Sequence, residues 1–202
     1  AGAATFGSGS TGISGIVSAS NSLVGGNTND LVGNNDVTAL SNGNYVVGSA
    51  LWDDGPVVNA GAATFGSGST GIVGLISASN SLVGSTANDS VGNPGVTALS
   101  NGNYVVRSTG WDNGAVINAG AATFGSGSTG IVGLVSASNS LVGGTANDQV
   151  SNPGVTALSN GNYVVGSSGW DNGPVINAGA ATFGSGSTGI SGIVSASNSL
   201  VG

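Results

Sequence analysis

Residues 155–167, VTALSNGNYVVGS, decide the fold that we expect for this chain. Their centre is Asn160-Gly161, a dipeptide that suits the tight turn of a two-stranded β-hairpin. In the second half the side chains alternate, so that Tyr163 and Val165 share one face of a strand and Val164 lies on the other. The stretch therefore predicts an antiparallel hairpin with strands at 155–158 and 163–167.

Two further strands are expected downstream of this hairpin. Residues 170–174, WDNGP, suit a turn, and the small residues of 178–183 make a third strand that allows close packing of sheets. Residues 194–201 alternate between apolar and polar side chains and make a fourth strand. Because the chain has 40 glycines and no helical periodicity, we predict a four-stranded antiparallel meander without helices.

The hairpin recurs along the chain with a period of 59 residues. Residues 60–118 and 119–177 differ at only seven positions, and residues 1–25 are identical to residues 178–202. We therefore expect one continuous repeat domain. Its parts are a partial repeat with the last two strands at 1–25 and three repeats at 26–84, 85–143 and 144–202. The aromatic residues that mark the period are Phe6, Phe65, Phe124 and Phe183; Tyr45, Tyr104 and Tyr163; and Trp52, Trp111 and Trp170.

Near-identical units of this length bury their apolar faces against one another in propellers, solenoids and arrays. We expect an all-β fold of tandem four-stranded antiparallel sheets in a propeller-like arrangement, with a three-sheet β-prism or a β-solenoid as alternatives. A closed propeller uses about 4–8 blades, so three units and a remnant cannot close alone. Three alternatives follow: a fragment of a longer array, a three-sheet prism-like domain, or an assembly in which the terminal segment of one copy occupies the equivalent place in a neighbour. Because residues 1–25 and 178–202 are identical, they would compete for one docking site, which is the condition for exchange between copies and would give a filament.

The composition limits the partners of the chain. Only eight Asp and one base, Arg107, carry formal charge, and the net charge is −7. A surface of this kind is made of hydroxyls, amides and backbone, and it suits packing against copies of itself. With one cation, neither nucleic acid nor an anionic membrane is an expected partner, and no apolar run approaches the roughly 18 residues of a membrane span.

Two resemblances follow from these motifs. The run from Leu158 to Ser167, followed by Gly-Ala-Ala-Thr at 179–182, resembles the blades of integrin-type (FG-GAP) β-propellers. The whole unit, with Asn-Ser-Leu-Val-Gly, Ala-Asn-Asp and Tyr-Val-Val, is similar to the tandem repeats of large filamentous-haemagglutinin-like bacterial surface proteins. Integrin-type blades often carry a calcium loop rich in Asp, whereas the corresponding residues 41–44, SNGN, contain no carboxylate.

The Asp residues after each Trp are candidate metal ligands. Carboxylate, amide and backbone oxygens are the hard donors that Ca²⁺ prefers, so a bound Ca²⁺ is the one cofactor that we consider. The alternative is an Asx-turn, in which the carboxylate accepts a hydrogen bond from the backbone two residues onward. We favour the turn because a tight calcium site needs several convergent carboxylates. The candidates are Asp53, Asp54, Asp112 and Asp171, and the loops with Asp30, Asp89 and Asp148 offer the same choice.

The aromatic residues have two possible roles. Trp52, Trp111 and Trp170 could form a platform on which sugars stack, although we favour a plug between neighbouring sheets because the chain has few other bulky side chains. The remaining aromatic residues are expected to belong to the structural core. They are Phe6, Phe65, Phe124 and Phe183, together with Tyr45, Tyr104 and Tyr163.

No catalytic function is expected, because the chain has no His, Lys or Glu that could activate a Ser nucleophile. We expect instead an extracellular structural or adhesive protein, secreted or on a cell surface, that associates with copies of itself into a fibre, sheath or adhesin stalk. The alternative is a carbohydrate-binding, lectin-like propeller or prism module. Glycans or a host or cell surface are further possible partners.

Overall fold

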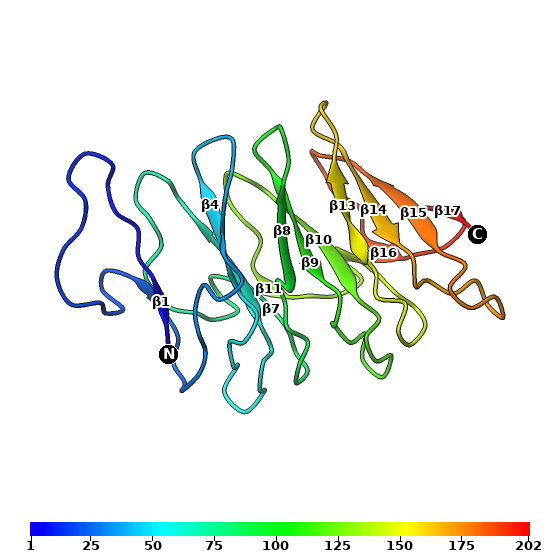
Figure 1. Ribbon diagram of the computed structural model, residues 1–202, viewed down its shortest axis with the longest axis horizontal. Helices are drawn as coiled ribbons and strands as arrows, with labels where there is room; N and C mark the ends of the chain where they lie inside the picture. The colour runs from blue at the N-terminus through cyan, green and yellow to red at the C-terminus, as the bar shows by residue number, and fades with distance from the viewer.

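The computed structural model describes residues 1–202 and contains seventeen β-strands and no helix. The strands form four sheets, which follow one another in chain order along the long axis of the molecule (Figure 1). The N-terminus and the C-terminus lie toward opposite ends of this row. None of the chain forms a helix long and apolar enough to span a membrane. The prediction of an all-β repeat fold is confirmed.

Each sheet draws most of its strands from one unit. The first sheet contains β1 (Ala3–Ala4), β2 (Leu23–Val24) and β6 (Gly74–Leu75). The second contains β3 (Val37–Ala39), β4 (Tyr45–Ser49), β5 (Ala62–Gly66), β7 (Leu82–Val83) and β11 (Gly133–Leu134). The third contains β8 (Pro94–Ala98), β9 (Tyr104–Ser108), β10 (Ala121–Gly125), β12 (Ser140–Val142) and β16 (Gly192–Ile193). The fourth contains β13 (Pro153–Ala157), β14 (Tyr163–Ser167), β15 (Ala180–Gly184) and β17 (Leu200–Val201).

The predicted hairpin is present in each of the three complete units. In the last unit β13 and β14 pair antiparallel, with Val155 opposite Val165. The turn between them is fastened by Asn160, whose side-chain oxygen accepts a hydrogen bond from the backbone N–H of Asn162 at 3.1 Å. The predicted third strand follows as β15, which pairs with β14 along five residues.

The predicted fourth strand, residues 194–201, is wrong in its extent. Only Leu200–Val201 belongs to the sheet of its own unit, as β17. The residues before it form a turn because the side chain of Asn198 accepts a hydrogen bond from Ser195 N and donates one to Ile193 O. Just upstream, β16 pairs in parallel with β12 of the preceding unit. Each of the two inner sheets therefore has four antiparallel strands and a fifth, parallel strand from the next unit.

The apolar core lies between the sheets rather than within any one of them. We call the face of a sheet that is turned toward the C-terminal end its forward face and the other its backward face. In β4, Val46 packs forward against the third sheet and Val47 packs backward against the first. Three such clusters join the four sheets, so an inner sheet is covered on both faces by its neighbours, as expected for stacked repeats.

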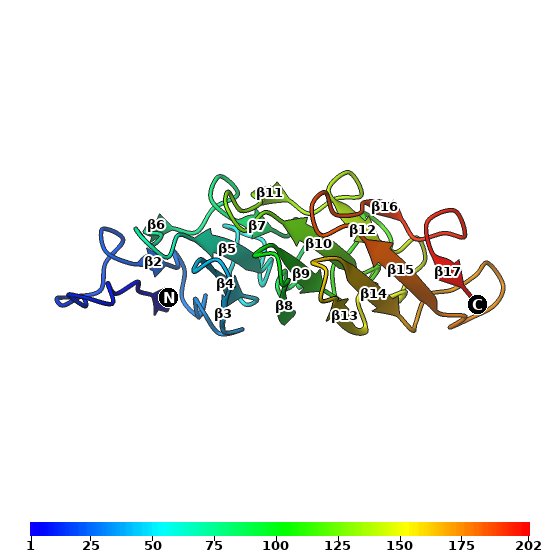
Figure 2. The same cartoon turned by 90° about the horizontal axis from the view of Figure 1, so that it is seen from above.

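The sheets form an open row (Figure 2). The propeller-like arrangement is therefore present only as stacked blades, and the row does not close into a ring or a prism. The short parallel strands β6, β11 and β16 lie along one long side of the row in this view. They tie neighbouring units together, because each is contributed by one unit to the sheet of the unit before it. The arrangement corresponds to a linear stack, in which each unit contacts only the units beside it.

The burial of each tyrosine and phenylalanine depends on whether a neighbouring sheet covers it. Tyr104 and Tyr163 are buried in the two clusters behind the third and fourth sheets, and burial raises the pKa of each hydroxyl to about 12. Phe65 and Phe124 pack against the same clusters and are partly buried. The expectation of a core residue fails for Phe183, which is 56% exposed because no sheet covers the forward face of the last unit.

Each tyrosine ring lies over a glycine of the neighbouring strand, and this contact yields a prediction. Tyr104 faces Gly125 in the pairing of β9 with β10, and a Cβ at Gly125 would meet the tyrosine ring. We expect Gly125→Ala to lower the free energy of unfolding by about 1–3 kcal/mol, because the ring is buried and has no room to move. Gly9→Ala is the matched control, since a Cβ there meets nothing within 4 Å. Urea denaturation measures both, and equal stability of the two variants would contradict the packing described.

Candidate functional site: the end faces of the sheet stack

The three tryptophans are parts of the core. Trp52, Trp111 and Trp170 belong to three different clusters and are at most 6% exposed. Stacking on a sugar requires one open face of the ring, and these rings present none. The structure therefore places them as plugs between neighbouring sheets and not as a platform for carbohydrate.

The Asp residue after each Trp holds the loop that links the second and third strands of its unit. Asp112 Oδ1 accepts a hydrogen bond from Asn118 N at 2.7 Å, and Asp53 and Asp171 do the same for the backbone N–H six residues onward. The predicted Asx-turn is thus wrong in its span, because the carboxylate bonds six residues away rather than two. Asp54 is exposed, and no hydrogen bond engages its carboxylate.

A second, buried carboxylate supports each of these loops. Asp89 accepts hydrogen bonds from the backbone N–H groups of Ser85 and Thr86 on Oδ2 and of Asp112 on Oδ1. The pKa of Asp89 is raised above its usual value, chiefly because the carboxyl is buried and also because of the charge of Asp112. The three backbone N–H donors act in the opposite direction and lower it. Sequence alone places this residue only in a candidate calcium loop. Its signal is the Ala-Asn-Asp motif, but that motif does not show that the carboxylate joins two loops.

These carboxylates do not gather into a metal centre. No group of three or more His, Cys, Asp or Glu side chains lies close enough to hold a metal ion together. Both carboxylate oxygens of Asp30, Asp89 and Asp148 accept hydrogen bonds from backbone N–H groups. Asp53, Asp112 and Asp171 each use one oxygen in the same way, so the geometry assigns the six residues to loop structure.

The forward face of the fourth sheet is the first unusual surface of the molecule. Leu200 is 81% exposed, whereas Leu82 and Leu141, which occupy the same place in the second and third sheets, are 0% exposed. The other apolar residues of this face show the same contrast. They are Leu158, Val164, Ala181 and Phe183, whose counterparts in the inner sheets are buried or packed against a cluster. The C-terminal end therefore presents an apolar face of the kind that the inner sheets bury.

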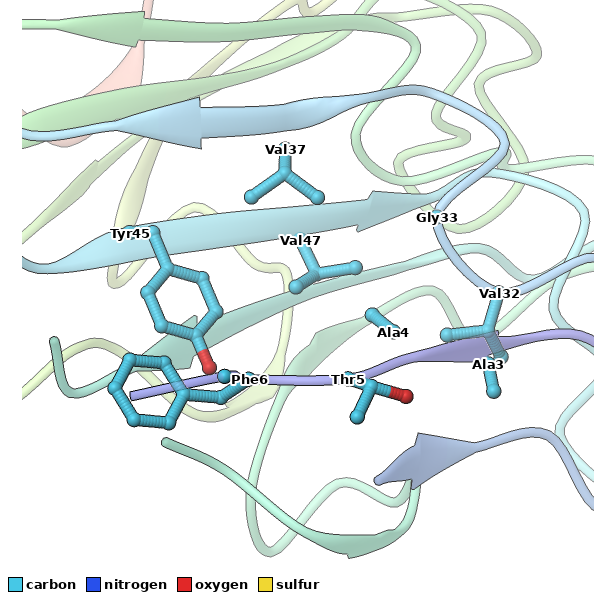
Figure 3. A pocket seen from close by; sticks show the side chains of 10 residues that line it. Ala3, Ala4, Thr5, Phe6, Val32, Gly33, Val37, Tyr45 and Val47 are labelled. Atoms are coloured by element: carbon cyan, nitrogen blue, oxygen red, sulfur yellow. The ribbon is translucent and has the colours of Figure 1, made fainter. Parts of the chain in front are cut away.

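A pocket at the N-terminal end is the second unusual surface. Its volume is about 430 Å³, and it lies between β1 with the residues after it and the backward face of the second sheet (Figure 3). Val37, Tyr45 and Val47 line it on the side of the sheet, and the ring of Phe6 stacks on that of Tyr45 at 6.2 Å. β1 pairs with β2 on one side and has no strand on its other side.

The position of the pocket is occupied by a β-hairpin at the equivalent contact between inner sheets. Between the second and third sheets, Leu40 and Val46 from the hairpin of β3 and β4 pack beside Tyr104 and Val106. The residues equivalent to Tyr104 and Val106 at the N-terminal end are Tyr45 and Val47, which line the pocket. The pocket therefore has the shape and chemistry to receive a hairpin like those of the inner sheets.

Polar contacts join the hairpin turn of one sheet to turns of the next sheet. Asn42 donates a side-chain N–H to the carbonyl of Gly127 at 2.7 Å, and Asn101 donates to Gly186 at 2.6 Å. Ser100 donates in the same way to the carbonyl of Ser159 at 3.2 Å. At the C-terminal end Asn160 has no following sheet to which its side-chain amide can donate. Within residues 1–202, the fourth sheet thus lacks both the polar and the apolar contacts that the forward faces of the inner sheets make.

Exposed aliphatic side chains also repeat along the side of the row. Three of them lie on the short parallel strands β6, β11 and β16, and the fourth, Ile16, has the equivalent place in the first unit; all are at least half exposed. The members of this row are Ile16, Leu75, Leu134 and Ile193. They offer a contact surface along the side, but nothing in the structure complements them as the two ends complement each other.

Comparison with known protein families finds a match to a repeat of unknown function (DUF5650). The match consists of four tandem segments at 1–34, 39–93, 98–152 and 157–202. Its last three starts are 59 residues apart, which agrees with the period of the sequence and of the sheets. Comparison with curated proteins finds no match.

Proposed function

We propose that this chain, which belongs to the family of the repeat of unknown function (DUF5650) over most of its length, is a structural protein that assembles with copies of itself into a fibre. The proposal is argued from the geometry of the sheets, because the function of the family is unknown. The observation that carries the proposal is that the forward face of one sheet and the backward face of the next are complementary. One end exposes the apolar forward face of a sheet, and the other contains a pocket shaped by a backward face. Inside the molecule these two kinds of face bury each other three times.

Such a contact has the symmetry of a fibre. The two surfaces differ from each other and lie at opposite ends of the row, so a contact between copies is head to tail. A head-to-tail contact whose rotation does not close a ring continues as an open filament. An apolar surface rimmed by polar residues is also typical of a protein interaction site, and the rim here is made of Ser, Asn and Gly. Assembly would remove this surface from water.

The proposal places the chain outside the cell, in a secreted fibre or sheath or in an adhesin stalk. The resemblance to filamentous-haemagglutinin-like surface repeats supports this location, as does a surface that is almost free of charge. Glycans or a host surface remain partners of such a fibre in this proposal. A lectin-like function has no support in the geometry, because the tryptophan rings that would stack on sugars are buried.

Sedimentation velocity over a range of concentrations tests the assembly. The unmodified chain is expected to form longer species as concentration rises, and Leu200→Asp is expected to stay monomeric because a charge would have to be buried at the contact. Leu200 is exposed in the single chain, so the variant is expected to fold normally. Ile117→Asp is the matched control, since Ile117 is also exposed but lies on a side loop away from both ends.

Two results would count against the proposal. One is an unmodified chain that remains a compact monomer at every concentration. The other is a Leu200→Asp variant that assembles as fully as Ile117→Asp, which would show that the forward face of the fourth sheet takes no part.

A further inference from the structure

We propose that two rows of sheets pair side by side through the open edges of β3, β8 and β13, so that each sheet continues across two copies. These strands are the outermost members of the second, third and fourth sheets, and each has a partner strand on one side only. They lie along the long side of the row opposite to β6, β11 and β16 (Figure 2). The third sheet is covered on both faces by its neighbours, so the open edge of β8 is a property of the repeat itself.

The unpaired backbone groups of β8 follow from its pairing with β9. Leu99 N donates to Asn103 O, and hydrogen-bonded pairs alternate from there along the antiparallel ladder. Val96 and Ala98 fall between these pairs, so their N–H and C=O groups point away from the sheet. Such an edge is a template on which another strand can pair.

The other two open edges repeat this arrangement. In β13 the outward residues are Val155 and Ala157, at the same place in a strand of identical sequence. In β3 they are Val37 and Ala39, but the N–H of Val37 already donates to the side chain of Asp36 at 2.7 Å. β8 lies against β3 and against β13, so the three edges lie one above another along the row.

The opposite edge of each sheet is closed in part. Leu134 of β11 points its backbone outward, because Gly133 and Val135 on either side of it donate to the neighbouring segment 81–83. The carbonyl of Leu134 accepts a side-chain N–H from Asn139 at 2.9 Å, and the equivalent carbonyls of β6 and β16 are capped in the same way. No side chain caps the edge of β8 in this manner, so β8 is on the side that is free to pair.

The outward residues determine a register for pairing with a second copy. When two β8 strands run antiparallel, Val96 of one copy lies opposite Ala98 of the other, and each such pair exchanges N–H···O bonds in both directions. Thr97 then lies opposite its own counterpart. A register moved toward the start of the strand would bring in Pro94, which has no N–H to donate.

This pairing has a simple symmetry. The two copies are related by a two-fold axis that passes beside Thr97, perpendicular to the sheet. An axis perpendicular to stacked sheets runs along the row, so it also passes beside Thr38 and Thr156, which lie one period away in either direction. All three edges therefore pair at once with their own counterparts. The forward faces of both copies point the same way, so the pairing is compatible with end-to-end contact and does not depend on it.

A second copy suits this surface better than a single extended peptide does. A peptide would occupy one edge, whereas a second row presents strands at the same intervals to all of them. β8 and β13 both read PGVTA and carry no charge, so the net charge of −7 places no repulsion on these two edges. Each strand pair is short, and the contacts act together along a row. Single chains are therefore expected to pair weakly and long rows firmly.

A single cysteine tests the register, because the natural chain contains no Cys. Opposite residues of a non-hydrogen-bonded antiparallel pair have Cα atoms about 4.5 Å apart, within the range that a disulfide spans. Thr97→Cys is therefore expected to link two copies through position 97 on mild oxidation. Mass spectrometry of the linked peptides identifies the bond. The same link is expected in a Leu200→Asp background, in which the end-to-end contact is removed.

Two other cysteine variants are the controls for this link. Ala98→Cys lies on the same strand, but two copies of position 98 are diagonal neighbours about 7–8 Å apart in this register. Thr129→Cys is exposed on a side loop and reports random collision. We expect Thr97→Cys to link several-fold faster than either, after each rate is divided by the rate at which a small thiol reagent modifies the same cysteine.

A triple lysine variant tests the pairing in the fibre. T38K/T97K/T156K places like charges opposite each other at the two-fold axis, which destabilises a strand pair. Electron microscopy is expected to show rods two rows wide for the unmodified chain and one row wide for this variant. The matched control, T70K/T129K/T188K, adds the same charge at exposed loop positions one period apart and is expected to keep the width of two rows.

The outcomes separate the side-by-side pairing from the end-to-end contact. Faster linkage at position 97, with narrow rods for the edge-lysine variant, supports the pairing. Linkage at 97 no faster than in the two controls, or edge-lysine rods as wide as those of the matched control, overturns it. Rods one row wide for the unmodified chain keep the fibre and overturn the pairing, whereas fast linkage at 97 without rods keeps the pairing and overturns the fibre.

Discussion

Leu141→Ala is expected to lower the free energy of unfolding by about 2–5 kcal/mol, whereas Leu200→Ala is expected to change it by less than about 0.5 kcal/mol. The two leucines occupy the same place in successive units and follow the same residues in sequence. Leu141 is buried between the third and fourth sheets, and its loss leaves a cavity. Leu200 faces solvent because no sheet follows the fourth. Urea denaturation at low concentration, followed by tryptophan fluorescence, measures both.

The two leucines differ only in the presence of a neighbouring sheet, because their side-chain chemistry and local sequence are the same. Equal losses for the two variants would mean that each unit encloses its own core, and the stack described above would not exist. The Leu200→Ala variant is expected to lose part of its assembly while keeping its stability.

Asp89→Ala is expected to lower the free energy of unfolding by about 3 kcal/mol or more. The substitution removes the acceptor of three backbone N–H groups, those of Ser85, Thr86 and Asp112, and a buried donor without a partner costs about 1–3 kcal/mol. Because one of these donors belongs to the loop that follows Trp111, two loops lose their connection together. Thermal and urea denaturation measure the effect.

Asp54→Ala is the matched control for this prediction. Asp54 is exposed and its carboxylate accepts no hydrogen bond, so the free energy of unfolding is expected to change by less than about 0.5 kcal/mol. If Asp89 acted as a calcium ligand instead, a chelator would destabilise the unmodified chain and leave Asp89→Ala unaffected. The hydrogen bonds to Asp89 predict that a chelator changes the melting temperature of neither.

Much of the architecture could be predicted because it depends on local signals that repeat. Asn160-Gly161 and the alternation from Tyr163 to Val165 are sufficient to place a hairpin, and the period places it in each unit. The period also indicates that units bury one another, which the three clusters between sheets confirm.

The remaining features depend on contacts between distant residues. Alternation in 194–201 resembles a strand, but Asn198 bonds to Ser195 and Ile193 and bends the chain into a turn. The parallel pairing of β16 with β12 joins residues of different units, and no local pattern encodes it. The spacing of Asp and Trp likewise does not show that the carboxylate of Asp89 reaches the loop after Trp111.

Electron microscopy of concentrated protein, with the sheets resolved along the axis, is the decisive experiment for end-to-end stacking. We expect unbranched rods in which the sheets of successive copies follow one another along the axis. Rods in which copies join only side by side would contradict the end-to-end contact. Separate four-sheet particles at every concentration would contradict the proposed assembly.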